Sequence, residues 1–315
     1  MSSEAQQDFG GSIGTTWPPK YDEDNDRVKG FQTKHIENPS LLIDSIDRLE
    51  SIADEKDAGR ITCRFVVDNE VEEPDLSGDI EVEIPLDGQW EGNKMIYYGE
   101  NYGERQSPQR DLERAEEIIQ RAVEKNYSQR IESVENKGYN LRVNPNPTDE
   151  LVEQMQEVYN QSYSNYPFDF KKDNIMDFFD NQIVIGEYED QVVFSYVGEV
   201  AELPIETSEG IRDFTMAELS DAATLENHGG EGLFVAGGQL LLEQLSEEEV
   251  DLVYGESRAS SYPVNIGSSR MGRNFEGTVE KHCEIGGRSD FEEKGPYENL
   301  NVWAITSEGL ESIYG

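Results

Sequence analysis

The stretch FTMAELSDAATLENHGGEGLFVAGGQLLLEQL, residues 214–245, decides the fold of this chain. Its first third alternates loosely between apolar and polar residues, as a strand does, and a loop with three glycines follows at 227–232. Apolar residues then recur at helical spacing from 233 to 245. A strand, a glycine loop and a helix in this order present unpaired backbone N–H groups with partial positive charge. The stretch is therefore a candidate phosphate site, with a simple tight turn as the alternative.

The chain is strongly acidic. Its 315 residues include 67 Asp and Glu against 26 Lys and Arg, which gives a formal net charge of -41. Apolar residues make up 35%, which is enough for a core, so we do not expect global disorder. Such a charge repels itself in dilute buffer, whereas at molar salt the screening length falls to about 3 Å. We predict a protein of the salt-loaded cytoplasm of a haloarchaeon, with an acidic mesophilic protein as the alternative.

Several classes of protein are not expected from this sequence. No basic face is visible, so nucleic acid is not an expected partner. Cys63 and Cys283 are too far apart in the chain to indicate a disulfide framework or a zinc site, and the three histidines lack ligand spacing. No apolar run approaches the roughly 18 residues of a membrane span, and the first residues do not resemble a secretion signal. We therefore expect no metal, no membrane and a reducing interior.

Turn signals and apolar patterns divide the chain into four parts. Residues 1–20 are polar and glycine-rich and predict a flexible arm. Residues 21–105 predict a small α/β domain, with a helix opened by Asn38-Pro39 and strands at 61–67, 80–84 and 95–98. Residues 106–143 predict a connector helix opened by Ser107-Pro108. Residues 144–315 predict a larger domain, whose first helix is capped by Thr148.

The larger domain begins with two helices separated by an aromatic loop at 166–170. Strands at 182–188 and 192–199 follow, joined by the two-residue turn Glu189-Asp190. After residues 214–245 the pattern predicts a strand at 250–254, a short helix at 265–271, and strands at 275–285 and 299–305.

This order of elements around a glycine loop resembles the GNAT acyltransferase superfamily. Four motifs make the chain similar to one branch, the β-lysine N-acetyltransferase-like proteins: YPF at 166–168, ELSDAATL at 218–225, SRASSYPVN at 257–265 and NVW at 301–303. The resemblance covers roughly residues 21–306. It implies an α/β (α+β) GNAT fold with a central mixed, mostly antiparallel sheet flanked by helices. A degenerate GNAT-like N-terminal half precedes that fold in this branch.

The resemblance also implies acetyl-CoA as the co-substrate. The positions that match its cofactor-binding residues are Ala223, Thr224, Leu225, Gly230, Gly232, Leu233 and Asn265. The loop departs from the superfamily pattern at Gly229, where Arg or Gln is usual, and at Phe234, which is expected to crowd the backbone at the pyrophosphate. Glu231 puts a carboxylate beside the anion site, although an acid there also stabilises the start of its own helix. Asn265 either hydrogen-bonds the pantetheine arm or caps the short helix.

Acetyl transfer to an amine needs a base for the ammonium proton and an acid for the leaving thiolate. Glu218 matches the superfamily's base on the strand before the loop, and Asp221 matches an acid of the branch. Strict alternation puts these two on opposite faces. The resemblance implies a β-bulge in this strand, which would bring both toward the cleft. The usual acid is a Tyr in the short helix, and Ser268 replaces it here, which leaves Tyr262 as the nearest substitute. The alternatives are solvated strand carboxylates and an ordinary packed Tyr.

Four residues are candidates for the acceptor site: Tyr166, Phe168, Arg258 and His282. The first two belong to the aromatic loop, which suits a lid over the acceptor or the edge of the core. Arg258 suits a substrate carboxylate, with an ion pair to one of the many acids as the alternative. His282 stands where the branch has Asn, which leaves the identity of the acceptor open.

Two functions follow from these observations. The first is an acetyl-CoA-dependent N-acetyltransferase that acts by direct transfer on the amino group of a small amino acid or amine, similar to β-lysine. The second is a catalytically degenerate GNAT-fold structural or interaction protein of a haloarchaeon or its virus. Either function is compatible with a homo-oligomer or a larger assembly.

The acidic composition makes a first prediction, on salt dependence. Below about 0.5 M salt the fold should lose stability, because the 67 carboxylates lose their screening. Circular dichroism during dilution from molar KCl measures this loss. A spectrum and a melting temperature that stay the same in dilute buffer would rule out the halophilic interpretation.

Overall fold

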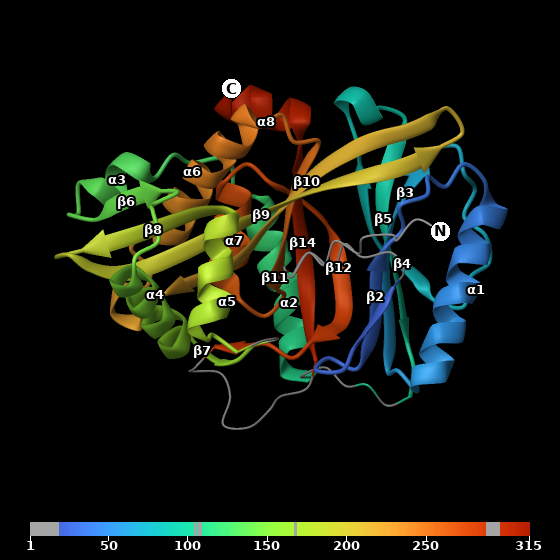
Figure 1. The fold of residues 1–315 in the computed structure, drawn as a ribbon, viewed down its shortest axis with the longest axis horizontal. Coiled ribbons are helices and arrows are strands. Elements are labelled where there is room, and N and C mark those ends of the chain that lie inside the picture. The colour runs from blue at the N-terminus through green and yellow to red at the C-terminus, as the bar shows by residue number, and fades with distance from the viewer. Residues whose placement is uncertain (1–18, 104, 106–108, 167–168, 288–296) are drawn as a thin grey trace, which may run out of the picture.

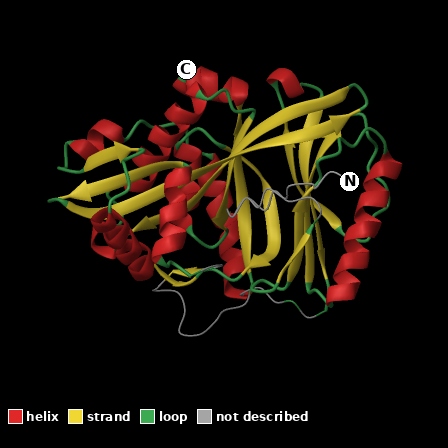
Figure 2. Cartoon of the chain, viewed as in Figure 1, coloured by secondary structure: helices red, strands yellow, loops and turns green. Residues whose placement is uncertain are grey.

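The computed structural model describes residues 19–103, 105, 109–166, 169–287 and 297–315 (Figure 1). Twelve strands form one sheet in the order β1-β2-β3-β5-β4-β12-β14-β11-β10-β9-β8-β6. The pairs β2–β3 and β10–β11 are parallel. The other neighbours in this sheet are antiparallel. Figure 2 shows helices on the outside of the sheet. The predicted α/β class, with a mixed and mostly antiparallel sheet flanked by helices, is confirmed.

The elements before residue 144 are β1 (Lys20–Asp22), β2 (Arg27–Phe31), α1 (Pro39–Lys56), β3 (Arg60–Asp68), β4 (Asp79–Pro85), η1 (Gly88–Trp90), β5 (Asn93–Asn101), α2 (Gln109–Val123), α3 (Ile131–Glu135) and β6 (Asn140–Val143). The next elements are α4 (Asp149–Ser162), β7 (Tyr163–Asn165), α5 (Lys172–Asp177), η2 (Phe178–Asp180), β8 (Gln182–Tyr188), β9 (Gln191–Thr207), β10 (Gly210–Thr224) and η3 (Glu226–His228). The chain ends with α6 (Leu233–Glu247), β11 (Leu252–Arg258), α7 (Tyr262–Arg270), β12 (Asn274–Cys283), β13 (Gly286–Gly287), β14 (Glu298–Thr306) and α8 (Ser307–Tyr314).

Helix starts follow the local signals in the sequence. α1 begins at Pro39, and the side chain of Asn38 accepts a hydrogen bond from the Leu41 amide. The Thr148 hydroxyl caps α4 in the same way, at 3.2 Å from the Leu151 amide nitrogen. Such a cap stabilises a helix by about 1 kcal/mol. Residues 1–18 of the predicted arm, the Ser107-Pro108 helix start and Phe168 lie outside the described residues, whereas Lys20 already belongs to β1. Among the described residues no helix is long and apolar enough to cross a bilayer.

The two strands of the central hairpin are longer than predicted. The strand expected at 192–199 continues to Thr207 as β9, and β10 runs beside it from Gly210 to Thr224. Figure 1 shows this hairpin crossing from the side of α4 and α5 toward the side of α1. At its far end Glu206 forms a parallel bridge with Lys34, just after β2. The sheet therefore curves until its N-terminal strands meet the end of β9.

The curved sheet encloses an apolar interior that belongs to both parts of the chain. The buried side chains that share this interior are Phe31, Val66, Val82, Ile84, Leu86, Trp90, Met95, Tyr97, Ala201, Leu203, Ile205, Phe214, Met216, Leu252, Tyr254, Val279, Val302 and Ala304. Burial of apolar area on this scale is the main stabilising term of the fold. A second buried cluster packs α4 and α6 on opposite faces of β9, because Ser195 contacts α4 whereas Phe194 and Tyr196 contact α6.

One residue pair joins the strands of the N-terminal part to those of the C-terminal part at the middle of the sheet. Gly277 of β12 lies opposite Val82 of β4, and it is the single pair in the register of these strands. Gly277 has φ +151°, which favours glycine. A Cβ atom there would lie 2.5 Å from the Glu81 carbonyl oxygen and 3.0 Å from the Val82 Cα. The close approach of the two backbones therefore requires glycine.

Replacement of this glycine should weaken the junction. We expect Gly277→Ala to lower the free energy of unfolding by about 1–3 kcal/mol, through overpacking and backbone strain. Denaturant titration measures the loss. Gly210→Ala is the matched control, because Gly210 has φ +129° and its Cβ would meet nothing within 4 Å. Equal losses in the two variants would show that close packing at the junction is not the reason for the glycine.

Candidate active site

The candidate active site lies where the parallel strands β10 and β11 separate. They pair at three positions, of which Glu218 with Tyr254 is the last. Beyond it β10 continues along β9, while β11 continues along β14 as far as Arg258. The two strands do not pair with each other beyond this point, so their backbones diverge, and we refer to the region between them as the wedge. The glycine loop and α6 follow directly at the open end of β10.

A β-bulge on β10 places the carboxylate of Asp221 on the same side of the sheet as Glu218. The register with β9 shifts between Ser220 and Ala223, and Asp221 within the shift has φ +50°. A bulge adds a residue to one strand and so reverses the alternation beyond it. The charge of Glu218 acts on Asp221 in this arrangement. The predicted bulge is present, and it brings the two predicted acids together.

These two acids belong to a larger buried group. Glu199 of β9 stands opposite Glu218, and the Ser220 hydroxyl donates to its Oε1 at 3.0 Å. The same hydroxyl lies 3.2 Å from Oδ2 of Asp221. The exposed fractions of Glu199, Glu218 and Asp221 are 4%, 6% and 4%. Three buried carboxyl groups this close cannot all be ionised without large cost, so at least one retains its proton near neutral pH.

Burial sets the proton affinity of the two central acids. Desolvation raises the pKa of Glu218 to about 8, the nearby Glu256 adds to the rise, and the guanidinium of Arg64 opposes it. Desolvation also raises the pKa of Asp221 to about 6, against the hydrogen bond that it accepts from Tyr166. A carboxyl group with a pKa near the working pH is a suitable general base or acid.

The N-terminal part contributes an arginine that the sequence did not reveal. Arg64 of β3 donates to the Tyr254 hydroxyl at 2.9 Å and to Glu256 Oε1 at 2.7 Å. The Tyr254 hydroxyl in turn donates to Oε2 of Glu218 at 2.8 Å. The guanidinium also lies 4.8 Å from the ring centroid of Tyr97. The sequence offered one signal for this role, a single charged residue inside the predicted strand at 61–67. It could not indicate the partner, because 190 residues separate Arg64 from Tyr254.

His282 lies at the same group of charges. Its Nε2 is 3.4 Å from Oε2 of Glu256, and its carbonyl oxygen accepts from Arg27 and Arg105. Desolvation and the neighbouring cations, Arg27 first, hold its pKa well below the usual range. His282 is therefore neutral near pH 7, and its Nδ1 has no hydrogen-bond partner among the described residues.

Two tyrosines contact the bulge, Tyr163 of β7 and Tyr166 at the start of the aromatic loop. The Tyr166 hydroxyl donates to Oδ1 of Asp221, and the Tyr163 hydroxyl donates to the Ala222 carbonyl at 2.5 Å. Arg258 at the end of β11 is close enough to lower the pKa of Tyr163, although desolvation raises it overall. Tyr166 thus contacts a predicted acid directly, whereas Arg258 lies near Tyr163.

Two predicted residues have other surroundings. Tyr262 begins α7 and packs with Ile266 and Trp303, whereas Glu218 points to the other face of the sheet. Asn265 is not a cap, because α7 starts three residues before it. Its amide donates to the carbonyls of Arg258 and Ser261, and its Oδ1 accepts from Asn301 and Trp303. This network ties the SRASSYPVN and NVW motifs together and leaves the side chain without spare capacity.

The glycine loop presents free amides. Leu225 still pairs with β9, its amide 2.9 Å from the Val193 carbonyl. Among the described residues no group accepts a hydrogen bond from the amides of residues 230–235. A Cβ on Gly230, at φ +79°, would meet nothing within 4 Å, and Gly232 with φ +99° precedes α6. The loop is therefore open and has the donors that a pyrophosphate needs.

Two side chains that seemed unfavourable are accommodated. The Lys137 ammonium lies 3.0 Å from Oε2 of Glu231, so the loop carboxylate is paired with a cation. Phe234 does not crowd the loop, contrary to expectation. Its ring stacks on Tyr196 at 5.1 Å, and it fills the space that the missing side chain of Gly267 leaves. The ring therefore lies between α6 and α7, away from the free amides.

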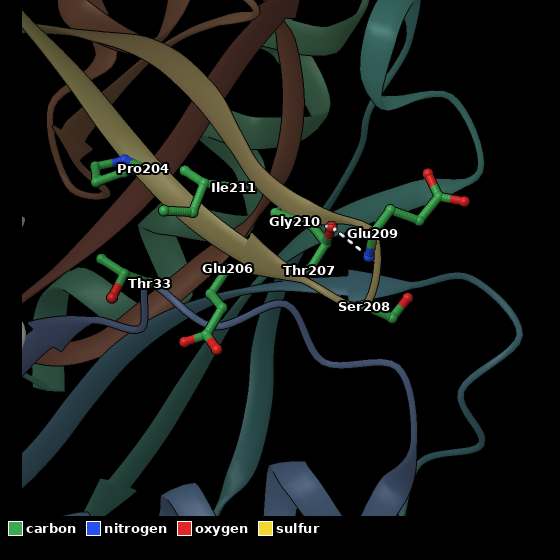
Figure 3. A pocket seen from close by; sticks show the side chains of 8 residues that line it. All are labelled: Thr33, Pro204, Glu206, Thr207, Ser208, Glu209, Gly210 and Ile211. Atoms are coloured by element: carbon green, nitrogen blue, oxygen red, sulfur yellow. Dashed lines mark hydrogen bonds between the residues drawn. The ribbon is translucent and has the colours of Figure 1, made fainter.

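A surface hollow elsewhere does not contribute to this site. It has a volume of about 540 Å³ and surrounds the turn between β9 and β10, with lining residues Thr33, Pro204, Glu206, Thr207, Ser208, Glu209, Gly210 and Ile211 (Figure 3). The hollow is far along β10 from Glu218. In the part of the chain that the structure describes, no three His, Cys, Asp or Glu side chains form a metal site.

Comparisons with known proteins concern the fold. No family model and no curated protein matches the chain. Among solved structures it is similar to the ribosomal-protein-S18-alanine N-acetyltransferase from Escherichia coli, with 11% identity, 53% of this chain and 94% of that chain covered, and a TM-score of 0.40. It is also similar to an N-acetyltransferase from Staphylococcus aureus, with 12% identity, 53% of this chain and 99% of that chain covered, and a TM-score of 0.41. An acetyltransferase from Salmonella typhimurium, solved with acetyl-CoA, has 11% identity, with 53% of this chain and 94% of that chain covered and a TM-score of 0.41. These values do not by themselves assign an activity.

The buried acid makes a prediction on pH. The pKa of Glu218 is about 8 in the folded state and about 4.5 in the unfolded state, so between these two pH values the folded state binds more protons than the unfolded state. Its contribution to stability is fully present below that lower value and is lost as the pH rises through about 8. Relative to wild type, the free energy of unfolding of Glu218→Gln should therefore rise between about pH 5 and pH 9. The exposed Glu202 of β9 gives the control variant Glu202→Gln. A pH-independent difference for Glu218→Gln would contradict the assignment.

Proposed function

We propose that this chain is an acetyl-CoA-dependent N-acetyltransferase that acts on the amino group of a small amino acid or amine, similar to β-lysine. One observation carries the proposal: Glu218, a buried carboxyl group with a raised pKa, lies at the last pair of β10 and β11, where the wedge opens. A base placed at such an opening can reach a substrate that enters between the strands.

The loop and the wedge are the proposed place for acetyl-CoA, which supplies the acetyl group as a thioester. The free amides of residues 230–235 would hold the pyrophosphate, and the open space at Gly230 fits a phosphate oxygen. Ala223, Thr224 and Leu225 line β10 on the way from the loop to the bulge. Asn265 supports α7 rather than binding the cofactor, because its hydrogen bonds are used.

The acceptor is proposed to bind on the face of the sheet that carries Glu199, Glu218 and Asp221. A group of buried carboxyls attracts an ammonium, and Arg258 beside Tyr163 suits a carboxylate on the same molecule. Tyr166 would cover this acceptor. An amino acid with a distant or second amino group, such as β-lysine, meets these requirements. Glu218 takes the proton that the attacking nitrogen loses, and Tyr254 orients its carboxylate.

The chain's N-terminal strands have a role in this proposal. Arg64 of β3 holds Tyr254 and Glu256 in place, so residues 21–105 would act as a supporting domain for the acceptor site. The division into an arm, this domain, a connector at 106–143 and a transferase domain at 144–315 remains a proposal, as does a salt-loaded cytoplasm.

A catalytically degenerate scaffold is the second candidate. Two observations favour it: Gly229 stands where the superfamily has Arg or Gln, and Ser268 stands where it has its tyrosine. An assembly of such chains would need no cofactor. Binding of acetyl-CoA therefore separates the two functions.

Calorimetric titration with acetyl-CoA in molar KCl tests the proposal. Wild type should bind, and Gly230→Ala should weaken binding by at least about tenfold, because its Cβ would occupy the place of a phosphate oxygen. Gly92→Ala is the control: Gly92 has φ +86°, its Cβ also meets nothing within 4 Å, and it lies before β5, outside the loop. Gly92→Ala should bind like wild type. No binding by wild type at millimolar ligand would favour the scaffold, and equal affinities of the two variants would place the cofactor elsewhere.

A further inference from the structure

Arg273, between α7 and β12, is a buried cation that has no counterion among the described residues. Its exposed fraction is 3%, and no described carboxylate forms an ion pair with it. Its terminal NH2 group donates to the Ser268 hydroxyl at 2.8 Å, and the guanidinium lies beside the Tyr196 hydroxyl. Its Nε and its other terminal nitrogen have no hydrogen-bond partner in the part of the chain that the structure describes. An unpaired buried charge is costly, so an arginine in this state points to an anion that is absent from the protein alone.

The unpartnered nitrogen lies at the apex of the wedge. Gly255 is the residue of β11 that directly follows the last pair with β10, and Leu219 is its counterpart on β10. A Cβ on Gly255 would lie 2.4 Å from the unpartnered terminal nitrogen of Arg273 and 2.8 Å from the Leu219 carbonyl oxygen. The glycine therefore leaves the space that the guanidinium occupies. Arg273 reaches this point from the side of α6 and α7, while Glu218 stands on the opposite face.

We propose that Arg273 forms an anion site at the apex of the wedge that receives the sulfur of coenzyme A as a thiolate; this inference rests on the proposed acetyl transfer. In that reaction the amine nitrogen forms a bond to the thioester carbonyl carbon and loses its proton to Glu218. The carbon–sulfur bond breaks, and its electron pair stays on sulfur. The thiolate then lies against the guanidinium, which stabilises the negative charge without itself giving up a proton.

This assignment explains how the site manages without the usual tyrosine. Ser268 has that position, and its hydroxyl is bound by Arg273 while it donates to the Val264 carbonyl at 2.9 Å. A serine is too short to reach the wedge. The longer arginine, held in place by that serine, brings a positive charge to the same region. A fixed cation thus replaces a proton donor for the leaving group.

The acidity of the coenzyme A thiol in the complex tests the proposal. Bound to wild type, the thiol should titrate at least about one unit below free coenzyme A, as thiols do beside a cation. In Arg273→Met the shift should disappear, and in Arg273→Lys part of it should remain. Ultraviolet absorbance of the thiolate measures this, with the protein alone as baseline. The chain's own thiols do not interfere, because desolvation raises the pKa of Cys63 and Cys283 to about 12.

Turnover supplies a second readout that a merely structural role would not move. Arg273→Met should lower kcat for acetyl-CoA by about 10²-fold, and the loss should shrink for an acetyl thioester of an aryl thiol, whose sulfur is a weaker base. Gly255→Ala, which displaces the guanidinium but keeps the charge, should reproduce part of both effects. Circular dichroism and the melting temperature establish that each variant folds.

The outcomes separate this inference from the proposed function. Coenzyme A that binds with the same thiol pKa to wild type and to Arg273→Met overturns the anion site and leaves the transferase proposal standing. Failure of wild type to bind coenzyme A in the calorimeter overturns both. Equal loss of kcat for alkyl and aryl thioesters would show that Arg273 does not act on the leaving group.

Discussion

The separation of β10 and β11 after Glu218 and Tyr254 is the constraint on which the rest of the structure depends. Beyond this pair β9 still pairs with the outer edge of β10, and β14 pairs with the outer edge of β11. The two inner edges, which face each other across the wedge, pair with no strand of the described chain along this stretch. Buried backbone groups need hydrogen-bond partners, so the wedge has backbone groups that the sheet does not use. The wedge is thus a product of sheet order.

The charges around the wedge are divided between its two faces. Carboxyl groups gather on the interior face, where burial raises the pKa of Glu218 and of Asp221. The guanidinium of Arg273 stands on the helical face, where no acid of the described chain forms an ion pair with it. These acids and Arg273 are buried, whereas most other acids of the described chain are exposed to solvent. Their burial is costly, and it is maintained because Tyr254, Ser220 and Tyr166 supply hydrogen bonds.

The N-terminal strands complete the interior face. Without Arg64, the buried Glu256 would have no guanidinium beside it, and Tyr254 would lose one of its two hydrogen bonds to charged groups. The same strands bury Trp90 against Phe214 of β10, with ring centroids 5.4 Å apart. The junction through Gly277 keeps both sets of contacts in register. The two parts of the chain are therefore coupled by polar and apolar contacts at once.

Features that depend on residues close together in the chain could be predicted from the sequence. Caps at Asn38 and Thr148, the turn at Glu189-Asp190, and the strand, glycine loop and helix of residues 214–245 depend on neighbours a few residues apart, and these predictions agree with the structure. The bulge was expected from the resemblance to the superfamily, and β10 has it between Ser220 and Ala223. Other features depended on contacts between residues far apart in the chain: Arg64 with Glu256, which are 192 residues apart, and Lys137 with Glu231, which are 94 apart. Spacing along a chain carries no information on such pairs. The sequence by itself determined most of the long helices and strands, although it did not indicate β1, β2, β6 or α8. The tertiary structure decided which charges meet at the wedge, because burial and sheet order, and not local pattern, select the partners of a buried charge.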